Sequence, residues 1–433
     1  MDYSKLFKIA KEKGVEDIQI SINTTKKTEI RYAKTELEAY TVSSIKEASI
    51  KGIYNGKMGK YHTEVVDEKE FEQMVDKVIE TAKYISDDDK VFIYDGKDNY
   101  QKIDNLYNKA LEETPSTEKI NMCKHIAAEI LKKEHVVHSM AVYIEEERIN
   151  EMVNSKGLNL KSQSNGFVLY AVAYVFKDND TRNNAAAYFS NDFSSINPNK
   201  IIDEAYNDAL KSIGAKAIKS GEYEAVLSED AAGTLLACFK GIFSSEMNQK
   251  NMSILKDKVG EKIASDCLTI VDDPFLENSM NRRTFDSDGV ATSKKEIVEN
   301  GVFKGFVYNL KTAYKENKKS TGNAIGSTCG LINPYYKPGL RTKDEMIKSV
   351  KRGVYITALN GAHAGANQIS CNFSLQVEGF LIEDGKLTQP IAVVTAADNY
   401  LSLLSKVVEV SSEIKNATDC TALRVSSISI SGE

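Results

Sequence analysis

The chain has 433 residues, of which 42% are hydrophobic and 27% are charged, a composition typical of folded globular proteins and not of disordered chains. Its 56 basic and 62 acidic residues give a formal net charge of -6, and dedicated nucleic-acid-binding proteins usually present a basic face instead. No stretch of about 18 apolar residues occurs, so we expect no membrane-spanning helix. The 6 cysteines are widely spaced and the N-terminus has no secretory signal. We therefore expect a cytoplasmic protein with reduced thiols.

The first half of the chain alternates between helix and strand patterns. Apolar residues at helical spacing predict helices over 3–13, 67–85, 116–131 and 199–213. Alternating apolar and polar residues predict strands over 18–22, 28–41, 45–63, 138–153 and 158–177. Asn55-Gly56 and residues 154–157 are typical of hairpin turns. This half is therefore predicted to pack helices on an antiparallel sheet.

The second half changes character after Gly221, where short strands and turns dominate. We expect helices over 228–242 and 342–352, the second of them capped by Thr342 with Glu345 and ended by Gly353. Two further hairpins are predicted at Asn300-Gly301 and Asp384-Gly385. This half is therefore predicted to be richer in strand than the first.

Together these patterns predict an α+β fold with two domains. The N-terminal domain spans 1–213 and carries helices on mixed or antiparallel sheet. A linker over 214–222 (GAKAIKSGE) leads to a strand-rich C-terminal domain over 223–433.

Motifs for metal and phosphate chemistry are missing from the sequence. Among the 5 histidines, only His135 and His138 approach the spacing of metal ligands, and Glu134 is the only acid beside them. Neither a phosphate-binding glycine-rich loop nor a G-x-S-x-G nucleophile turn occurs. Local motifs therefore predict no metal site in this chain.

A more specific signal is an ordered series of segments in the second half. It consists of 269–274 (TIVDDP), 285–292 (FDSDGVAT), 299–306 (ENGVFKGF), 320–324 (STGNA), 353–367 (GVYITALNGAHAGAN), 373–386 (FSLQVEGFLIEDGK) and Asn399. This series resembles the TldD/PmbA family, long described as modulators of DNA gyrase and regarded as metallopeptidase subunits. Residues 204–229 resemble the family's bridge between domains, so the resemblance covers nearly the whole chain.

The resemblance implies two kinds of subunit. The TldD type carries an H-E-x-x-x-H zinc helix and a cysteine near the C-terminus, whereas the PmbA type, also called TldE, lacks the helix motif. In the matching helix of this chain, 235–246, the positions of the motif are held by Ala237, Cys238 and Ile242. Alanine and isoleucine offer no lone pair to a metal, and Cys238 alone cannot replace two imidazoles and a general base. Cys420 lies near the C-terminal ligand region, but without a histidine pair we expect it to serve in packing. The chain therefore resembles the PmbA type, with no cofactor of its own and zinc expected in a TldD-type partner.

The remaining signature residues allow two interpretations. Acidic residues in turn-rich segments, Asp288 among them, accept backbone hydrogen bonds in many proteins, so they could be structural or could line a peptide cavity or subunit interface. His363 is the side chain that we expect most to face a cavity, with a structural role as the alternative. The candidates for the family signature or peptide cavity are Asp272, Asp273, Phe285, Asp286, Gly289, Ser320, Thr321, Gly322, Asn323, His363, Asn367 and Asn399.

The leading hypothesis is a noncatalytic subunit of a TldD/TldE-type zinc metallopeptidase complex that processes unfolded peptides. The partner would be a TldD-type zinc subunit in a heterodimer, or a second copy in a homodimer. β-edges would hold an extended peptide through backbone hydrogen bonds. One alternative is a stand-alone peptidase that uses Cys238, His363 and Asp286. The other is a regulatory or binding protein of the gyrase-modulator kind, although the acidic balance makes direct binding to nucleic acid an unfavoured expectation.

Overall fold

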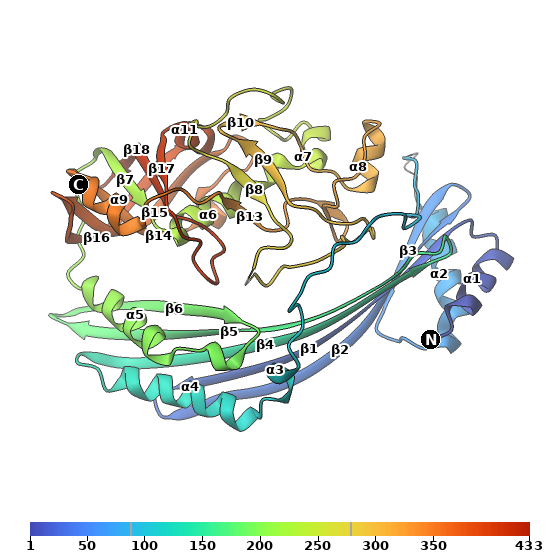
Figure 1. The fold of residues 1–433 in the computed structure, drawn as a ribbon, viewed down its shortest axis with the longest axis horizontal. Helices are drawn as coiled ribbons and strands as arrows, with labels where there is room; N and C mark the ends of the chain where they lie inside the picture. The colour runs from blue at the N-terminus through green and yellow to red at the C-terminus, as the bar shows by residue number, and fades with distance from the viewer. Residues whose placement is uncertain (87–88, 278) are drawn as a thin grey trace.

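The computed structural model describes residues 1–86, 89–277 and 279–433. A strongly curved sheet forms the first half, and its concave face is turned toward the strand-rich second half (Figure 1). The predicted α+β class is confirmed, with helices on an antiparallel sheet followed by a strand-rich region. None of the described helices combines the length and apolar character that a membrane crossing requires.

The curved sheet has 6 strands in the order β3-β2-β1-β4-β5-β6. Its strands are β1 (Ile18–Ala33), β2 (Glu36–Tyr54), β3 (Lys57–Thr63), β4 (Val136–Asn154), β5 (Asn159–Lys177) and β6 (Asp180–Ser190). The hairpin predicted at Asn55-Gly56 joins β2 to β3, and both residues adopt positive φ angles, of 51° and 71°. The hairpin predicted at 154–157 joins β4 to β5.

Helices cover the convex face of this sheet, where α4 and α5 lie beneath it in Figure 1. The helical segments are α1 (Tyr3–Glu12), η1 (Glu68–Glu70), α2 (Phe71–Lys83), α3 (Lys109–Glu113), α4 (Ser116–Leu131), η2 (Phe193–Ser195) and α5 (Pro198–Lys211). Pro198 begins α5, and the Asn197 side chain accepts a hydrogen bond from the Lys200 N–H. Asp67 caps η1, not α2, so the helix predicted from 67 begins with a short 3-10 turn.

The two faces of the curved sheet differ in chemistry, because successive residues of a strand point to opposite faces. On the helix-covered face, Tyr143 of β4 lies opposite Leu169 of β5, and both are fully buried. On the concave face, Asn150 of β4 lies between Asn23 of β1 and Ser162 of β5. A polar surface therefore faces the second half of the chain.

The second half is built on a sheet of 6 strands in the order β16-β15-β14-β7-β18-β17, and a further pairing of β16 with β18 closes it into a barrel. Its strands are β7 (Gly221–Leu227), β14 (Arg352–Asn360), β15 (Asn372–Glu383), β16 (Lys386–Asn399), β17 (Val407–Val410) and β18 (Leu423–Ser431). Smaller sheets contain β8 (Ile270–Asp272), β9 (Lys295–Glu299), β10 (Val302–Phe303), β11 (Ala324–Ile325), β12 (Thr328–Cys329) and β13 (Pro334–Tyr336). The predicted linker, 214–222, falls on the connection between α5 and β7, and its last two residues belong to β7.

Several short helices accompany the barrel. They are α6 (Glu229–Phe239), η3 (Lys240–Phe243), α7 (Ser245–Gln249), α8 (Leu310–Lys315), α9 (Lys343–Ser349), α10 (Ala362–Gly365) and α11 (Tyr400–Ser405). The capping box predicted for Thr342 and Glu345 is confirmed at the start of α9. The prediction that Gly353 ends this helix is wrong, because Gly353 lies in β14. There a Cβ atom would come within 2.4 Å of the Glu224 carbonyl oxygen of the neighbouring strand.

Candidate functional site

The helix that would carry zinc in a TldD-type protein corresponds to α6 and η3. Ala237 is exposed near the end of α6, Cys238 is half-buried against the barrel core, and Ile242 is buried in that core. Neither hydrocarbon side chain has an electron pair to donate, so the helix supplies one thiol where a zinc helix supplies two imidazoles and a carboxylate. The donor set at these positions does not fit a zinc ion.

A cavity of about 230 Å³ lies beside α6. Ala237, Lys240, Asp419 and Cys420 are among the residues that line it. Burial raises the pKa of Cys420 to about 12 and also raises the pKa of Asp419, so both groups are held toward their protonated forms, which bind metal poorly. In the described ranges, no three His, Cys, Asp or Glu side chains are grouped so that they could hold a metal ion.

Asp272 is the centre of a buried network at the end of β8. Its Oδ1 accepts hydrogen bonds from the Ile332 N–H at 2.7 Å and the Asn333 N–H at 2.9 Å. Its Oδ2 accepts one from the Asn323 amide at 2.8 Å and lies 3.6 Å from the Lys295 Nζ. Burial lowers the pKa of Lys295, although the Asp272 charge opposes this shift. The carboxylate therefore anchors two distant turns and neutralises a buried cation.

The segment 320–324 is tied into the same network. The Asn323 Oδ1 accepts hydrogen bonds from the Lys295 Nζ at 2.9 Å and from the Thr321 hydroxyl at 2.8 Å. The Ser320 hydroxyl donates to the Tyr308 carbonyl at 3.1 Å. Gly322 has a φ of +70°, and a Cβ there would lie 2.3 Å from a backbone oxygen, so only glycine fits the turn. These candidate residues position one another.

Asp286 has a comparable role in the FDSDG turn. Its Oδ1 accepts hydrogen bonds from the Asp288 N–H at 2.9 Å and the Val290 N–H at 3.0 Å, and its Oδ2 accepts one from the Ala324 N–H at 2.9 Å. Burial and the nearby Asp288 carboxylate raise the pKa of Asp286 to about 7, although the backbone donors oppose the shift. Asp286 therefore holds the turn and joins it to β11.

The other acidic, aromatic and glycine candidates also make structural contacts. Asp273 accepts a hydrogen bond from a backbone N–H at 2.9 Å and pairs with the Lys294 Nζ at 2.9 Å. The ring of Phe285 meets the ring of Tyr100 edge to face, with centroids 6.4 Å apart. The Tyr100 hydroxyl donates to the Gly289 carbonyl at 2.7 Å. Phe285 and Gly289 therefore attach the irregular segment before α3 to the C-terminal half.

The last three candidates lie on the barrel. His363 is exposed on α10 and lines neither the cavity beside α6 nor a second cavity over the concave face of the curved sheet. Asn367 accepts a hydrogen bond from the Ser370 N–H at 2.9 Å, and Asn399 caps α11 while its amide donates to the Ser370 carbonyl at 2.8 Å. The two asparagines therefore shape one turn. A role for His363 in a peptide cavity stays a prediction.

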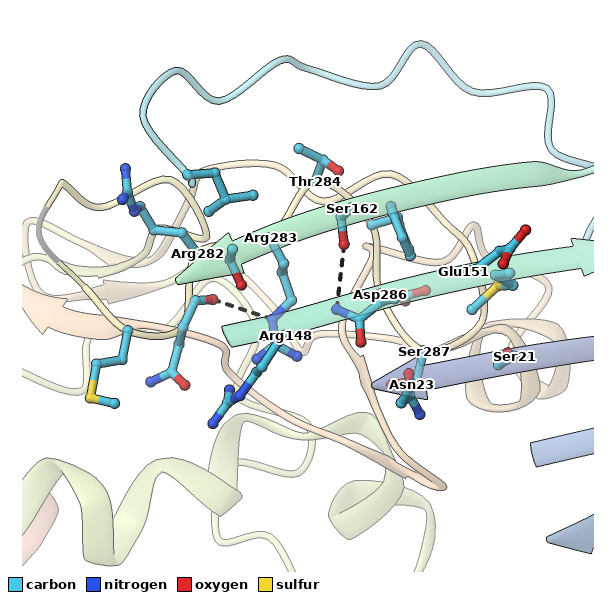
Figure 2. A pocket seen from close by; sticks show the side chains of 17 residues that line it. Ser21, Asn23, Arg148, Glu151, Ser162, Arg282, Arg283, Thr284, Asp286 and Ser287 are labelled. Carbon is cyan, nitrogen blue, oxygen red and sulfur yellow. Dashed lines mark hydrogen bonds between the residues drawn. The ribbon is translucent and has the colours of Figure 1, made fainter. Parts of the chain in front are cut away.

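The second cavity, also of about 230 Å³, is lined by the candidates Phe285 and Asp286 together with residues that sequence reasoning did not single out. It lies between the concave face of the curved sheet and the loop 280–287 (Figure 2). The sheet contributes the polar side chains of Ser21, Asn23, Arg148, Asn150, Ser162 and Ser164. The loop contributes Arg283 and Asp286, and both side chains are drawn toward the sheet in Figure 2.

The loop that carries Arg283 is fixed by backbone contacts. The Arg283 N–H donates to the Pro274 carbonyl at 3.0 Å, and the Thr292 hydroxyl donates to the Arg283 carbonyl at 2.6 Å. The Arg283 Nε donates to the Asn281 carbonyl at 3.2 Å, which orients the guanidinium group. No sequence motif joins Arg283 to Arg148, because the two meet only when the loop packs over the sheet.

Comparisons with known proteins agree on one family over most of the chain. The model of the PmbA/TldA metallopeptidase C-terminal domain matches residues 220–432, and that of the central domain matches residues 109–213. Metalloprotease MJ0996 of Methanocaldococcus jannaschii is 24% identical over 423 residues, which cover 94% of this chain and 92% of that protein. A metalloprotease of Methanothermobacter thermautotrophicus is 30% identical over 213 residues, which cover 48% of this chain and 46% of the relative.

Solved structures extend the likeness to the fold. A proposed modulator of DNA gyrase from Thermotoga maritima is 31% identical, with a TM-score of 0.93 and 99% of both chains covered. TldE from Thermococcus kodakarensis has a TM-score of 0.88 at 23% identity, again over 99% of both chains, and this match shows the shared fold. By sequence and by structure, the chain belongs to the PmbA/TldD family of metallopeptidase-like proteins.

Proposed function

We propose that this chain is the noncatalytic, TldE-like subunit of a zinc metallopeptidase complex, and that a TldD-type chain supplies the zinc. The observation that carries the proposal is the chemistry of α6 and η3. An exposed methyl group, a half-buried thiol and a buried alkyl chain occupy Ala237, Cys238 and Ile242. The subunit would then serve to bind and position peptides while its partner cleaves them.

The concave face of the curved sheet supports a role with unfolded peptides. Its polar side chains face a cavity and are not packed into a core, so the surface can accept a flexible polar chain. Within the described residues, the part of β2 before Ala48 has no strand pairing on its outer side. Such an edge can hold an extended peptide through backbone hydrogen bonds whatever its sequence.

The test compares the purified chain with the complex. After dialysis, we expect metal analysis to find no stoichiometric zinc in the isolated chain and to find zinc in a co-purified TldD-type partner. The isolated chain should leave an unfolded peptide intact, and the complex should cleave it. Replacing a histidine of the partner's H-E-x-x-x-H motif should abolish cleavage, whereas Cys238→Ala in this chain should leave it unchanged.

Three results would contradict the proposal. The first is one zinc per isolated chain, and the second is failure to co-purify with a TldD-type protein. The third is cleavage by the isolated chain that His363→Ala or Cys238→Ala removes, which would favour a stand-alone peptidase. In the described structure no hydrogen bond joins Cys238, His363 and Asp286, and the Asp286 carboxylate is already engaged by backbone donors.

A further inference from the structure

Arg283 is an inward-facing cation without an ion-pair partner among the described residues. Among the described residues, no carboxylate lies within 4.0 Å of its guanidinium group, whereas most other arginines form an ion pair. The paired arginines are Arg31, Arg148, Arg182, Arg341 and Arg424. Arg352 is exposed to solvent, and Arg282 donates to the Asn105 carbonyl at 3.0 Å. Arg282 lines the same cavity without an ion pair to a described residue, so the wall carries two arginines of this kind, and Arg283 is the one that lies beside Arg148.

The surroundings of Arg283 disfavour its charged form. Burial lowers the pKa of Arg283, and the neighbouring Arg148 guanidinium lowers it further. Figure 2 shows both side chains in the same cavity. A half-buried cation beside a second cation costs stability, so keeping both groups there implies a compensating ligand.

The acidic residues nearby provide only part of that compensation. Glu146 is occupied by Arg148, whose Nε and terminal nitrogen lie 3.0 and 2.5 Å from one carboxylate oxygen. Glu151 lines the cavity but raises the pKa of Tyr3, which places its carboxylate toward α1 on the opposite face of the sheet. The Asp272 and Asp286 carboxylates raise the pKa of Arg283, but by less than burial and Arg148 lower it, and Asp286 uses both oxygens for backbone hydrogen bonds. These carboxylates therefore stabilise the Arg283 charge only in part.

The opposite wall offers uncharged hydrogen-bonding groups. The Asn150 amide donates to the Ser162 hydroxyl at 3.4 Å, a long contact that a ligand oxygen could replace. Ser164 and Asn23 add a hydroxyl and an amide to the same wall. A planar guanidinium group binds a carboxylate through two parallel N–H donors, and neighbouring neutral donors can satisfy the remaining lone pairs.

We propose that this cavity binds a carboxylate group of a peptide, with Arg283 as the main contact and Arg148 beside it. The identity of the ligand as a peptide rests on the proposed function, whereas the carboxylate preference rests on the cavity alone. The carboxylate can come from the C-terminus of the peptide or from an aspartate or glutamate side chain, because both present the same planar group.

The experiment is calorimetric titration of the full chain with three N-acetylated peptides. They are penta-alanine with a free C-terminal carboxylate, its C-terminal amide, and the amide with one alanine replaced by aspartate. We expect the amide to bind at least about tenfold more weakly than a peptide that carries a carboxylate. A preference for the free acid over the aspartate peptide would assign the site to the C-terminus, and the reverse would assign it to the side chain.

Variants separate binding from folding. Arg283→Gln should remove the difference between acid and amide, and the matched variant of an exposed arginine, Arg352→Gln, should retain it. Because Arg283→Gln removes a repulsion with Arg148, its thermal unfolding midpoint should not fall. Equal binding of acid and amide, or a preference that survives in Arg283→Gln, would overturn the carboxylate site and leave the proposed subunit role intact. Failure of all three peptides to bind the wild-type chain would overturn the carboxylate site together with the peptide-binding part of the proposed function.

Discussion

Replacing Asp272 with alanine removes the acceptor that organises the signature turns of the C-terminal half. The side chain is 0% exposed, and its loss leaves the Ile332 and Asn333 N–H groups and the Asn323 amide without their acceptor. It also leaves the Lys295 ammonium, whose side chain is 17% exposed, without the carboxylate 3.6 Å away. The substitution therefore tests whether this signature aspartate is structural.

The expected loss follows from the buried charge. Removing one partner of a buried ion pair costs about 3–5 kcal/mol, because the other charge stays desolvated. Hydrogen bonds to a charged group contribute about 1.5–3 kcal/mol each, but three bonds to one carboxylate are not additive. Burial already lowers the pKa of Lys295, so the lysine can release its proton and limit the damage. We expect the free energy of unfolding to fall by about 3–5 kcal/mol.

Urea unfolding at neutral pH measures this change. The chain has 21 tyrosines and no tryptophan, so tyrosine fluorescence and circular dichroism are the suitable probes. A double-mutant cycle that combines Asp272→Ala with Lys295→Met should give a coupling free energy of at least about 1 kcal/mol between the two side chains. Asp266→Ala, at a side chain 84% exposed, is the matched control and should change little. A loss below about 1 kcal/mol in Asp272→Ala would refute the structural interpretation.

Three further predictions concern other buried groups. Folding raises the pKa of Asp286 from 3.8 to about 7, so the Asp286 carboxyl loses its proton at a lower pH in the unfolded chain than in the folded chain. The free energy of unfolding should therefore fall as the pH rises across that interval. In Asp286→Asn, the free energy of unfolding, measured at several pH values, should lack this part of its dependence on pH. Gly322→Ala forces a side chain into a φ of +70° and should cost more than about 2 kcal/mol, whereas Gly241→Ala, with open space around it, should not. Ellman's reagent should label the exposed Cys267 in the native protein, and Cys420 only after unfolding, since burial raises its pKa to about 12.

Local patterns predict much of the fold. Alternation in β4 and β5 and the positive-φ pair Asn55-Gly56 are properties of neighbouring residues, so they are visible in the sequence. β6 was not predicted, because residues 180–184 are all polar and the apolar residues that follow are consecutive, so polar and apolar positions do not alternate. The role of Gly353 was misassigned because the need for glycine at this position comes from another strand. The backbone of β7 lies too close to Gly353 to leave room for a side chain.

In the candidate site, too, sequence motifs predicted some of the residues and missed those that only the tertiary structure brings together. The signature segments led to Asp272 and Asn323, which do meet in one network although they are far apart in the chain. The cavity around Arg148 and Arg283 was missed, because neither arginine belongs to a pattern. Their meeting depends on the curvature of the sheet and on the loop that packs over it. Only tertiary structure reveals that an arginine lacks an ion-pair partner.

The position of β7 in the barrel has a consequence for synthesis on the ribosome. β7 pairs with β14 and with β18, and β18 is the last of the barrel strands along the chain, ending at Ser431. The ring of strands cannot close until β18 has been synthesised, whereas the curved sheet and its helices are already available. Closing so long a loop is slow, and the unpaired strands are open to wrong partners in the meantime. A truncation that removes only β18 should therefore affect solubility more than its length suggests.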